Sequence, residues 1–135
     1  MKLEHIAIWT QDLERLKDFY VRYFNGVAGE RFENPAYSFA SYFVRFEGGS
    51  RLELMQMPSV PRSRDDVRAQ FTGYIHIAFD VGTRQELESL AARLPAEGLE
   101  LLEAPHVTAD GYYEATVLDP DGNRVELAVM PEAMA

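Results

Sequence analysis

The sequence contains no cysteine among its 135 residues. It therefore cannot form a disulfide framework, a thiolate zinc site, an iron–sulfur cluster or a cysteine nucleophile. The absence of cysteine is typical of a protein of the reducing cytoplasm, and we expect that location. Any chemistry must come from carboxylates, hydroxyls, a bound ion or histidine, of which the chain has three.

Long apolar runs and excess positive charge are also missing. No stretch approaches the ~18 apolar residues that a membrane-spanning helix needs. Glu4 and His5 stand where a signal peptide would have an apolar core. Lysine and arginine total 13 against 22 aspartates and glutamates, for a formal net charge of −9. This charge opposes binding to nucleic acid or to an anionic membrane, so we expect a small-molecule partner.

The length predicts one domain covering 1–135, because domains most often run about 100–150 residues. Hydrophobic residues make up 47% and charged residues 26%, an ordinary globular mixture. Within that domain the hydrophobic pattern repeats. We expect a first module at about 1–57, a connector at 58–72 and a second module at about 73–130.

The first module alternates between the period of a strand and the period of a helix. Asn25 and Gly26 end the helix, because both tolerate a positive φ. Glu33–Pro35 is expected to be a loop, and the strand before it is weak. The predicted elements are a strand at Leu3–Trp9, a helix at Leu13–Phe24, a strand within Val27–Phe32, and strands at Tyr37–Phe46 and Arg51–Met57.

The second module has the same order of elements. Pro95 is expected to stop its helix. The predicted elements are a strand at Tyr74–Val81, a helix at Arg84–Leu94, and strands at Leu99–Glu103, Tyr112–Leu118 and Arg124–Met130. The fold class predicted is therefore α+β, built from paired βαβββ modules.

Four polar residues occupy matched places in the two modules. His5 and His76 are 71 residues apart in the first strands, and Glu53 and Glu126 are 73 apart in the last strands. Each interrupts an apolar strand, where a carboxylate is costly unless it is paired or bound to a cation. A lone histidine or glutamate on a strand is more often structural, but the matched offsets favour a shared site. Two imidazoles and two carboxylates suit zinc, nickel, cobalt, manganese or iron better than calcium.

Four segments carry a family resemblance, namely Leu3–Ala7, Asp18–Tyr20, Asp119–Asn123 and Val125–Leu127. With the four polar residues on paired modules, they make the chain similar to the vicinal oxygen chelate superfamily of glyoxalases, bleomycin resistance proteins and dioxygenases. The resemblance implies a curled mixed sheet around a central cleft, with helices on the outer faces. It also implies a homodimer. Whether the four residues meet within one chain or across the dimer stays open.

The ligand order His, Glu, His, Glu resembles bacterial glyoxalase I, as does the segment Glu33–Tyr37. Two positions depart from that enzyme. Trp9 stands where it has an arginine that contacts glutathione, and Met57 stands where it has an asparagine. Both changes remove polar contacts to glutathione, so the metal chemistry can be kept while the thiol differs.

The resemblance implies a metal-dependent lyase or isomerase that transfers a proton through a metal-bound enediolate. His5, Glu53, His76 and Glu126 would be the metal ligands, with Glu126 as the base and Glu53 as its counterpart. Nickel or zinc is the expected metal, with manganese, cobalt or iron as alternatives. Two other functions stay open: a ligand-binding or drug-resistance protein of the same fold, and an Fe(II) extradiol-type dioxygenase.

Other residues have two interpretations each. Side chains two residues from a ligand share its face of the strand. On this basis we expect the substrate pocket to be lined by Trp9, Met55, Met57 and Tyr74. The alternative interpretation is that these side chains pack in the core or in a dimer interface. The connector holds three arginines, Arg62, Arg64 and Arg68. They belong either to a solvated loop or to a lid that binds an anionic substrate. His106 is expected at the surface, in a loop at Pro105–Gly111.

Overall fold

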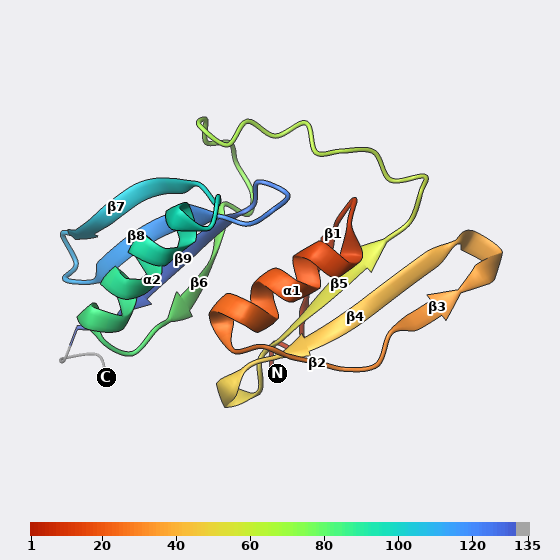
Figure 1. The fold of residues 1–135 in the computed structure, drawn as a ribbon, viewed down its shortest axis with the longest axis horizontal. Coiled ribbons are helices and arrows are strands. Elements are labelled where there is room, and N and C mark those ends of the chain that lie inside the picture. Colours follow the sequence, from red (N-terminus) through yellow and green to blue (C-terminus); the bar gives the residue numbers. More distant parts are fainter. Residues whose placement is uncertain (132–135) are drawn as a thin grey trace. The chain divides into compact units, whose positions relative to one another are not determined.

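The computed structural model describes residues 1–131 of the chain. The chain divides into two compact units, Met1–Asp65 and Asp66–Ala135, here called the N-terminal and C-terminal units. Each unit contains one sheet and one long helix (Figure 1). In the described part of the chain, no helix is long and apolar enough to cross a membrane.

The N-terminal unit is a mixed sheet covered on one face by helix α1. The strand order is β1-β5-β4-β2, and β3 also pairs with β4. Strand β1 runs parallel to β5, and the other pairs are antiparallel. The elements are β1 (Ile6–Trp9), α1 (Leu13–Phe24), β2 (Val27–Ala28), β3 (Phe32–Asn34), β4 (Phe39–Arg45) and β5 (Arg51–Gln56), with 3-10 turns at Pro35–Tyr37 and Glu47–Gly49.

Helix α1 has the bounds that the sequence predicts. Its start is capped by the Asp12 carboxylate, which accepts a hydrogen bond from the Arg15 amide at 3.0 Å. Its end is Asn25, whose φ of 53° is the left-handed conformation expected at a helix C-cap. One face of the helix is buried with the β4 and β5 side chains beneath it, and this core comprises Leu13, Leu16, Phe19, Tyr20, Phe24, Val44, Leu52 and Leu54.

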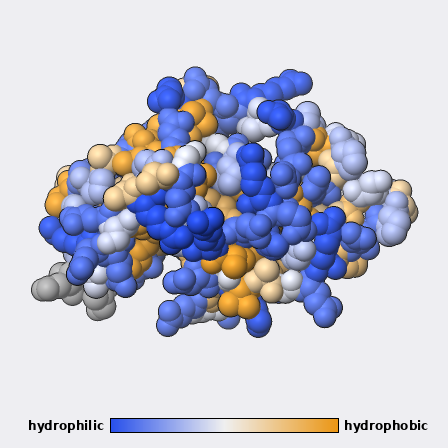
Figure 2. All heavy atoms as spheres, in the orientation of Figure 1, coloured by the Kyte–Doolittle hydropathy of each residue, from blue (hydrophilic) through white to orange (hydrophobic). Residues whose placement is uncertain are grey.

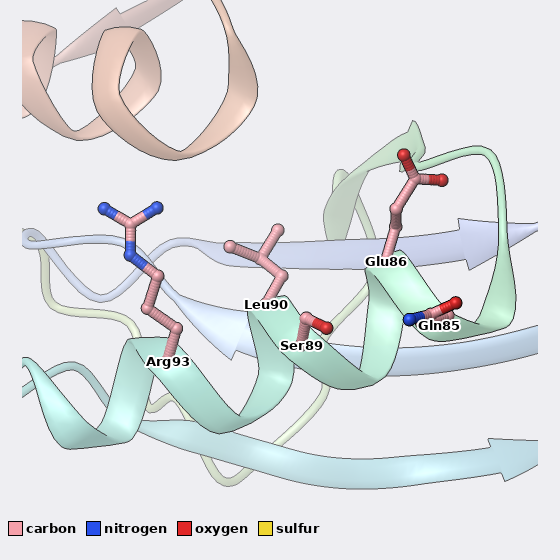
Figure 3. A pocket seen from close by; sticks show the side chains of 5 residues that line it. All are labelled: Gln85, Glu86, Ser89, Leu90 and Arg93. Atoms are coloured by element: carbon pink, nitrogen blue, oxygen red, sulfur yellow. The ribbon is translucent and has the colours of Figure 1, made fainter.

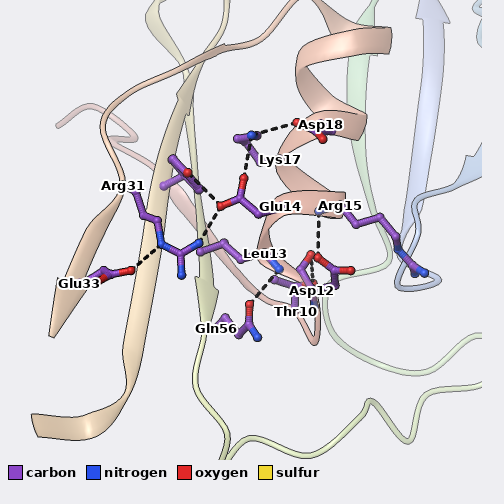
Figure 4. Close-up of polar contacts among 11 residues, drawn as sticks. Thr10, Asp12, Leu13, Glu14, Arg15, Lys17, Asp18, Arg31, Glu33 and Gln56 are labelled. Atoms are coloured by element: carbon purple, nitrogen blue, oxygen red, sulfur yellow. Dashed lines mark hydrogen bonds and ion pairs between the residues drawn. The ribbon is translucent and has the colours of Figure 1, made fainter. Parts of the chain in front are cut away.

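A charged cluster ties the first turn of α1 to the sheet (Figure 4). The Glu14 carboxylate accepts hydrogen bonds from Lys17 at 2.8 Å, Arg31 at 2.6 Å and the Tyr42 hydroxyl at 3.0 Å. Arg31 also donates to Glu33 at 2.8 Å. These donors, Lys17 foremost, lower the pKa of Glu14 to about 2. The cluster therefore adds an acid-sensitive link between helix and strands.

The C-terminal unit repeats the arrangement with a four-stranded sheet. The strand order is β6-β9-β8-β7, with β6 parallel to β9 and the other pairs antiparallel. Its elements are β6 (His76–Asp80), α2 (Arg84–Ala96), β7 (Leu101–Val107), β8 (Tyr113–Leu118) and β9 (Arg124–Val129). The predicted α+β class with paired modules is confirmed.

Helix α2 runs two residues past its predicted end. Thr83 caps its start by accepting a hydrogen bond from the Glu86 amide at 3.2 Å. Pro95 lies inside the last turn, and the Glu97 amide still bonds the Arg93 carbonyl at 3.1 Å. A proline this close to the end removes one amide donor without disrupting the turns before it. The buried face of α2 consists of Leu87, Ala91 and Leu94.

Two loops of the prediction are wrong, because both segments form edge strands. Residues of the expected loop at Glu33–Pro35 pair with β4 as β3. Strand β7 continues through Pro105 to Val107, where a loop was expected. Since β7 is the outermost strand of its sheet, Pro105 can sit in it without breaking a ladder. The face drawn in Figure 2 is largely hydrophilic, with separate hydrophobic spots.

Candidate metal centre

Each sheet has one face under its helix and a second face that we call the open face. The predicted ligands lie on the open faces at matching places. Glu53 is the register partner of Ala7 on β1, and Glu126 is the partner of Ala78 on β6. The histidines were expected within strands, but His5 comes directly before β1 and His76 is the first residue of β6. Each imidazole therefore sits at the strand end, where the chain enters the sheet.

In the N-terminal unit, His5 and Glu53 form one pair. The His5 Nε2 lies 3.4 Å from the Glu53 Oε2. The Glu53 side chain is 20% exposed and projects between Leu52 and Leu54, which point the other way into the core under α1. The carboxylate is therefore held at the sheet surface by the burial of its two neighbours.

A second layer of contacts orients the His5 ring. Its Nδ1 bonds the Glu4 carboxylate, which also pairs with Arg51. The ring meets Phe43 edge-to-face at 5.3 Å, and the Arg51 guanidinium lies 4.3 Å from the centre of the same Phe43 ring. A carboxylate on Nδ1 takes the hydrogen of that nitrogen and orients the ring, so Nε2 is the nitrogen left to bind a metal. The His5 Nε2 is thus presented toward Glu53 as a metal ligand would be.

In the C-terminal unit, His76 and Glu126 form the equivalent pair. The His76 Nε2 lies 3.3 Å from the Glu126 Oε2, and the Glu126 side chain is 15% exposed. Burial raises the pKa of Glu126 above its usual range, His76 opposes that shift, and negative charge on Glu114, Glu103 and Asp110 adds to it. Glu126 therefore lies in a more negative setting than an isolated ion pair would provide.

The spacing of both pairs fits two ligands of one small divalent cation. With ligand bonds near 2.0–2.1 Å, two donor atoms are about 2.9 Å apart at a right angle and about 3.4 Å apart at the tetrahedral angle. The observed 3.4 and 3.3 Å fall within this range. Each unit thus holds one imidazole and one carboxylate at a spacing that two ligands of one ion would have.

A hollow of about 420 Å³ lies beside the His76–Glu126 pair. Most of the side chains in its wall are polar or charged. Besides the pair itself, its walls include Arg68, Glu103, Glu114, Thr116 and Arg124. Strand parity would have located part of this wall, since Thr116 is the register partner of Glu126.

Arg124 is one of the residues that line the hollow. Only 8% of it is exposed, and its Nη2 donates to the carbonyls of Val67 and, at 2.7 Å, of Ala69. The guanidinium thereby fastens the chain before β6 to strand β9. The sequence interpretation did not single out Arg124, although its place two residues before Glu126 puts it on the same face.

The expected pocket residues fall into two groups. Trp9 is 41% exposed and meets Phe39 edge-to-face at 6.1 Å. Met55, its register partner, shares the face of Glu53, and Met57 follows the end of that strand. Tyr74, by contrast, is fully exposed before β6. The aromatic surface beside a predicted ligand therefore belongs to the N-terminal unit.

The third histidine is also on an open face. His106 lies on β7, so its expected place in a loop is wrong. Its Nε2 is 3.6 Å from the Glu114 Oε1 on β8. Of the connector arginines, Arg68 pairs with Glu100 at 2.7 Å, and Arg62 and Arg64 are exposed in coil.

A further shallow groove follows the outer side of α2 (Figure 3). Its side chains come from successive turns of that helix, Gln85, Glu86, Ser89, Leu90 and Arg93. It combines neither histidine nor paired carboxylates. The open faces, rather than this groove, therefore hold the candidate site.

Comparisons with known proteins agree with the fold. The family model described as the Glyoxalase/Bleomycin resistance protein/Dioxygenase superfamily matches residues 2–127. A search among curated proteins finds no match. A glyoxylase/bleomycin resistance protein/dioxygenase domain from a Frankia species is similar in structure, with a TM-score of 0.80, 17% identity, and coverage of 97% of this chain and 98% of that one.

Two other solved structures are similar along most of their length. The trypanothione-dependent glyoxalase I of Leishmania major has a TM-score of 0.77 and 23% identity, covering 99% of this chain and 90% of that one. A mutant of the fosfomycin resistance protein FosX from Listeria monocytogenes, complexed with Mn(II) and 1S,2S-dihydroxypropylphosphonic acid, has a TM-score of 0.71 and 20% identity, covering 98% and 95%. At these identities the likeness concerns the fold.

Proposed function

Because the chain belongs to the glyoxalase/bleomycin resistance protein/dioxygenase superfamily, we propose that it is a metal-dependent, glyoxalase-like lyase or isomerase. Its substrate would be a small molecule with oxygens on neighbouring carbons. One observation carries the proposal: a histidine and a glutamate stand 3.4 and 3.3 Å apart at equivalent places in the two units. The FosX complex, which holds Mn(II) and a vicinal diol, supports this substrate class.

In the proposed site, His5, Glu53, His76 and Glu126 hold one divalent cation per chain, with partners from the same chain or from a second copy in a homodimer. Nickel or zinc is the first choice, with manganese, cobalt or iron as alternatives. When bound, the cation would polarise the substrate oxygens and make the adjacent C–H more acidic. It would also offset two carboxylate charges that are largely buried.

The residues of the chain would divide the remaining work. Glu126 is the proposed base, placed to take a proton from one substrate carbon and return it to the next. The family resemblance is the ground for this assignment, and the two carboxylates are similarly buried, with 15% of Glu126 and 20% of Glu53 exposed. His5 and His76 would serve as ligands, and the bond from His5 to Glu4 supports that role on the N-terminal side.

We propose a substrate with one apolar part and one polar part. Trp9, Phe39 and Met55 form an apolar surface on the face of Glu53. Arg124 and Thr116 line the polar hollow beside Glu126. Because Trp9 and Met57 are not the polar residues that bind glutathione in bacterial glyoxalase I, the thiol part of the substrate is proposed to be other than glutathione.

The proposal is tested by metal analysis followed by turnover. Protein purified without added metal should contain nickel or zinc at about one per chain. The metal-loaded protein is then assayed with 2-oxoaldehyde adducts of glutathione and of other thiols. Glu126→Gln should lower kcat by about 10²-fold or more. The matched control is Glu88→Gln. The Glu88 carboxylate accepts a hydrogen bond from the Tyr113 hydroxyl at 2.9 Å, and Glu88 does not line the hollow.

The same measurements separate the alternatives. Oxygen-sensitive Fe(II) with consumption of O₂ would favour a dioxygenase. Absence of metal, with ligand affinity unchanged by Glu53→Gln and Glu126→Gln, would favour a binding or resistance protein. Failure to turn over any 2-oxoaldehyde–thiol adduct after metal loading would remove the glyoxalase assignment.

A further inference from the structure

A second group of potential ligands lies on the open face of the C-terminal sheet. Glu103 and His106 on β7 and Glu114 on β8 each offer a donor atom, and the three atoms lie within 4.8 Å of one another. The group shares no residue with the four ligands proposed above. It also uses the one histidine that the proposed function leaves without a role.

The strand register explains how these side chains meet. His106 pairs with Glu114, and Glu103 pairs with Thr116, so the two β8 residues are two apart and share a face. Glu103 and His106 are three apart, and a regular strand would point them to opposite faces. A register shift between them brings both side chains to the open face. The irregular strand is therefore what assembles the group.

The hydrogen bonds leave the donor atoms available. The Ala104 carbonyl accepts only, so the His106 Nδ1, 2.9 Å away, carries a hydrogen, and Nε2, which faces Glu114, is the ring nitrogen left to bind a cation. A backbone carbonyl on Nδ1 is a common support for a metal-binding histidine. The Thr116 hydroxyl donates to the Glu103 Oε2 at 3.1 Å, a bond that involves only one of the two carboxylate oxygens.

The group brings two carboxylates close together. Among residues 1–131, neither Glu103 nor Glu114 has a lysine or arginine at ion-pair distance, and the Glu114 side chain is only 18% exposed. A bound cation would balance these two carboxylates and would also bind the imidazole nitrogen.

We propose that Glu103, His106 and Glu114 form a second divalent-cation site. One nitrogen and two carboxylate donors suit zinc, manganese or cobalt better than calcium or magnesium. Because the His106 side chain is 46% exposed, the ion would retain water ligands and exchange readily. Glu103 and Glu114 also line the hollow beside His76 and Glu126, so this cation faces the same space as a ligand in that hollow.

The test follows the three histidine rings by ¹H–¹⁵N NMR during a Zn²⁺ titration. With only three histidines in the chain, His→Gln variants assign each ring. The metal-free His106 ring should carry its proton on Nδ1, and zinc should shift its Nε2 signal. The double variant Glu103→Gln, Glu114→Gln should raise the zinc concentration at the midpoint of that shift at least about tenfold. Glu88→Gln, the matched control, should leave it unchanged.

The two sites are distinguished with Glu53→Gln plus Glu126→Gln. In that variant the His106 shift should persist, while zinc binding at His5 and His76 weakens. An unchanged His106 signal at saturating zinc in the wild-type protein would overturn the second site. So would a shift that survives removal of both Glu103 and Glu114 in a variant with a native circular dichroism spectrum. If instead His106 responds and the other two rings do not, the proposed function fails and the second site stands.

Discussion

Replacement of Arg124 by methionine tests how the wall of the hollow is held. The methionine keeps the apolar stem of the side chain and removes the guanidinium. The structure assigns two close hydrogen bonds to that group, to the carbonyls of Val67 and Ala69. A third contact, to the Asp66 carbonyl at 3.5 Å, is too long to contribute much.

The magnitude follows from those two bonds. A hydrogen bond from a charged donor contributes about 1.5–3 kcal/mol to stability. Water can enter the hollow and solvate the freed carbonyls, which lowers the combined loss. We therefore expect Arg124→Met to reduce the free energy of unfolding by about 2–3 kcal/mol. Arg124→Lys should recover part of the loss, because an ammonium can reach one carbonyl but not two in a fixed fork.

Urea denaturation gives the free energy, and amide exchange locates the change. Exchange should accelerate at Arg68 and Ala69, whose amides bond Asp66 at 2.9 and 3.1 Å. Amides of α2 should respond less. A loss below about 0.5 kcal/mol, within the range of an ordinary surface substitution, together with unchanged exchange at these two amides, would refute the reasoning.

Three further substitutions test the charge cluster, the orientation of His5 and the core. The pKa of Glu14 is lowered to about 2, so its contribution is present above about pH 4.5 and is lost as the pH falls toward 2. Glu14 is 49% exposed, so Glu14→Gln should lower the free energy of unfolding by only about 1 kcal/mol at pH 7 and by nothing near pH 2, as measured by urea denaturation. An equal loss at both pH values would contradict this. Glu4→Gln should weaken zinc binding at His5 by about tenfold or more, measured by the NMR titration, and unchanged binding would remove the orienting role. Leu127→Ala, at a fully buried position, should lower the free energy of unfolding by about 2–5 kcal/mol. A loss below about 1 kcal/mol would contradict this, because it would mean that the neighbouring side chains fill the cavity.

The features that the sequence predicts best are those encoded by neighbouring residues. Helix α1 was predicted with its observed bounds, because a capping aspartate, an apolar stripe and an Asn-Gly end lie within one segment. The matched places of His5 and His76, and of Glu53 and Glu126, follow from the repeat, since equivalent positions in two modules occupy equivalent places. The exact spacing of those atoms needed the parallel register of the first and last strands.

The features that were missed depend on contacts between distant segments. Strand β3 has three residues, too few to show a period, and it forms by pairing with β4. The face on which His106 lies depends on a register shift that no hydrophobic pattern records. Arg124 acquires its role from the path of the chain at Val67–Ala69, which the composition of the connector does not specify.

The central claim is that His5, Glu53, His76 and Glu126 bind one cation together. Anomalous diffraction at the absorption edge of the bound metal tests it directly, in crystals of the metal-loaded protein. The account predicts a peak within about 2.0–2.2 Å of two histidine Nε2 atoms and two glutamate oxygens, one set per chain. A metal held by only one of the two pairs, or no peak at either pair, would contradict it.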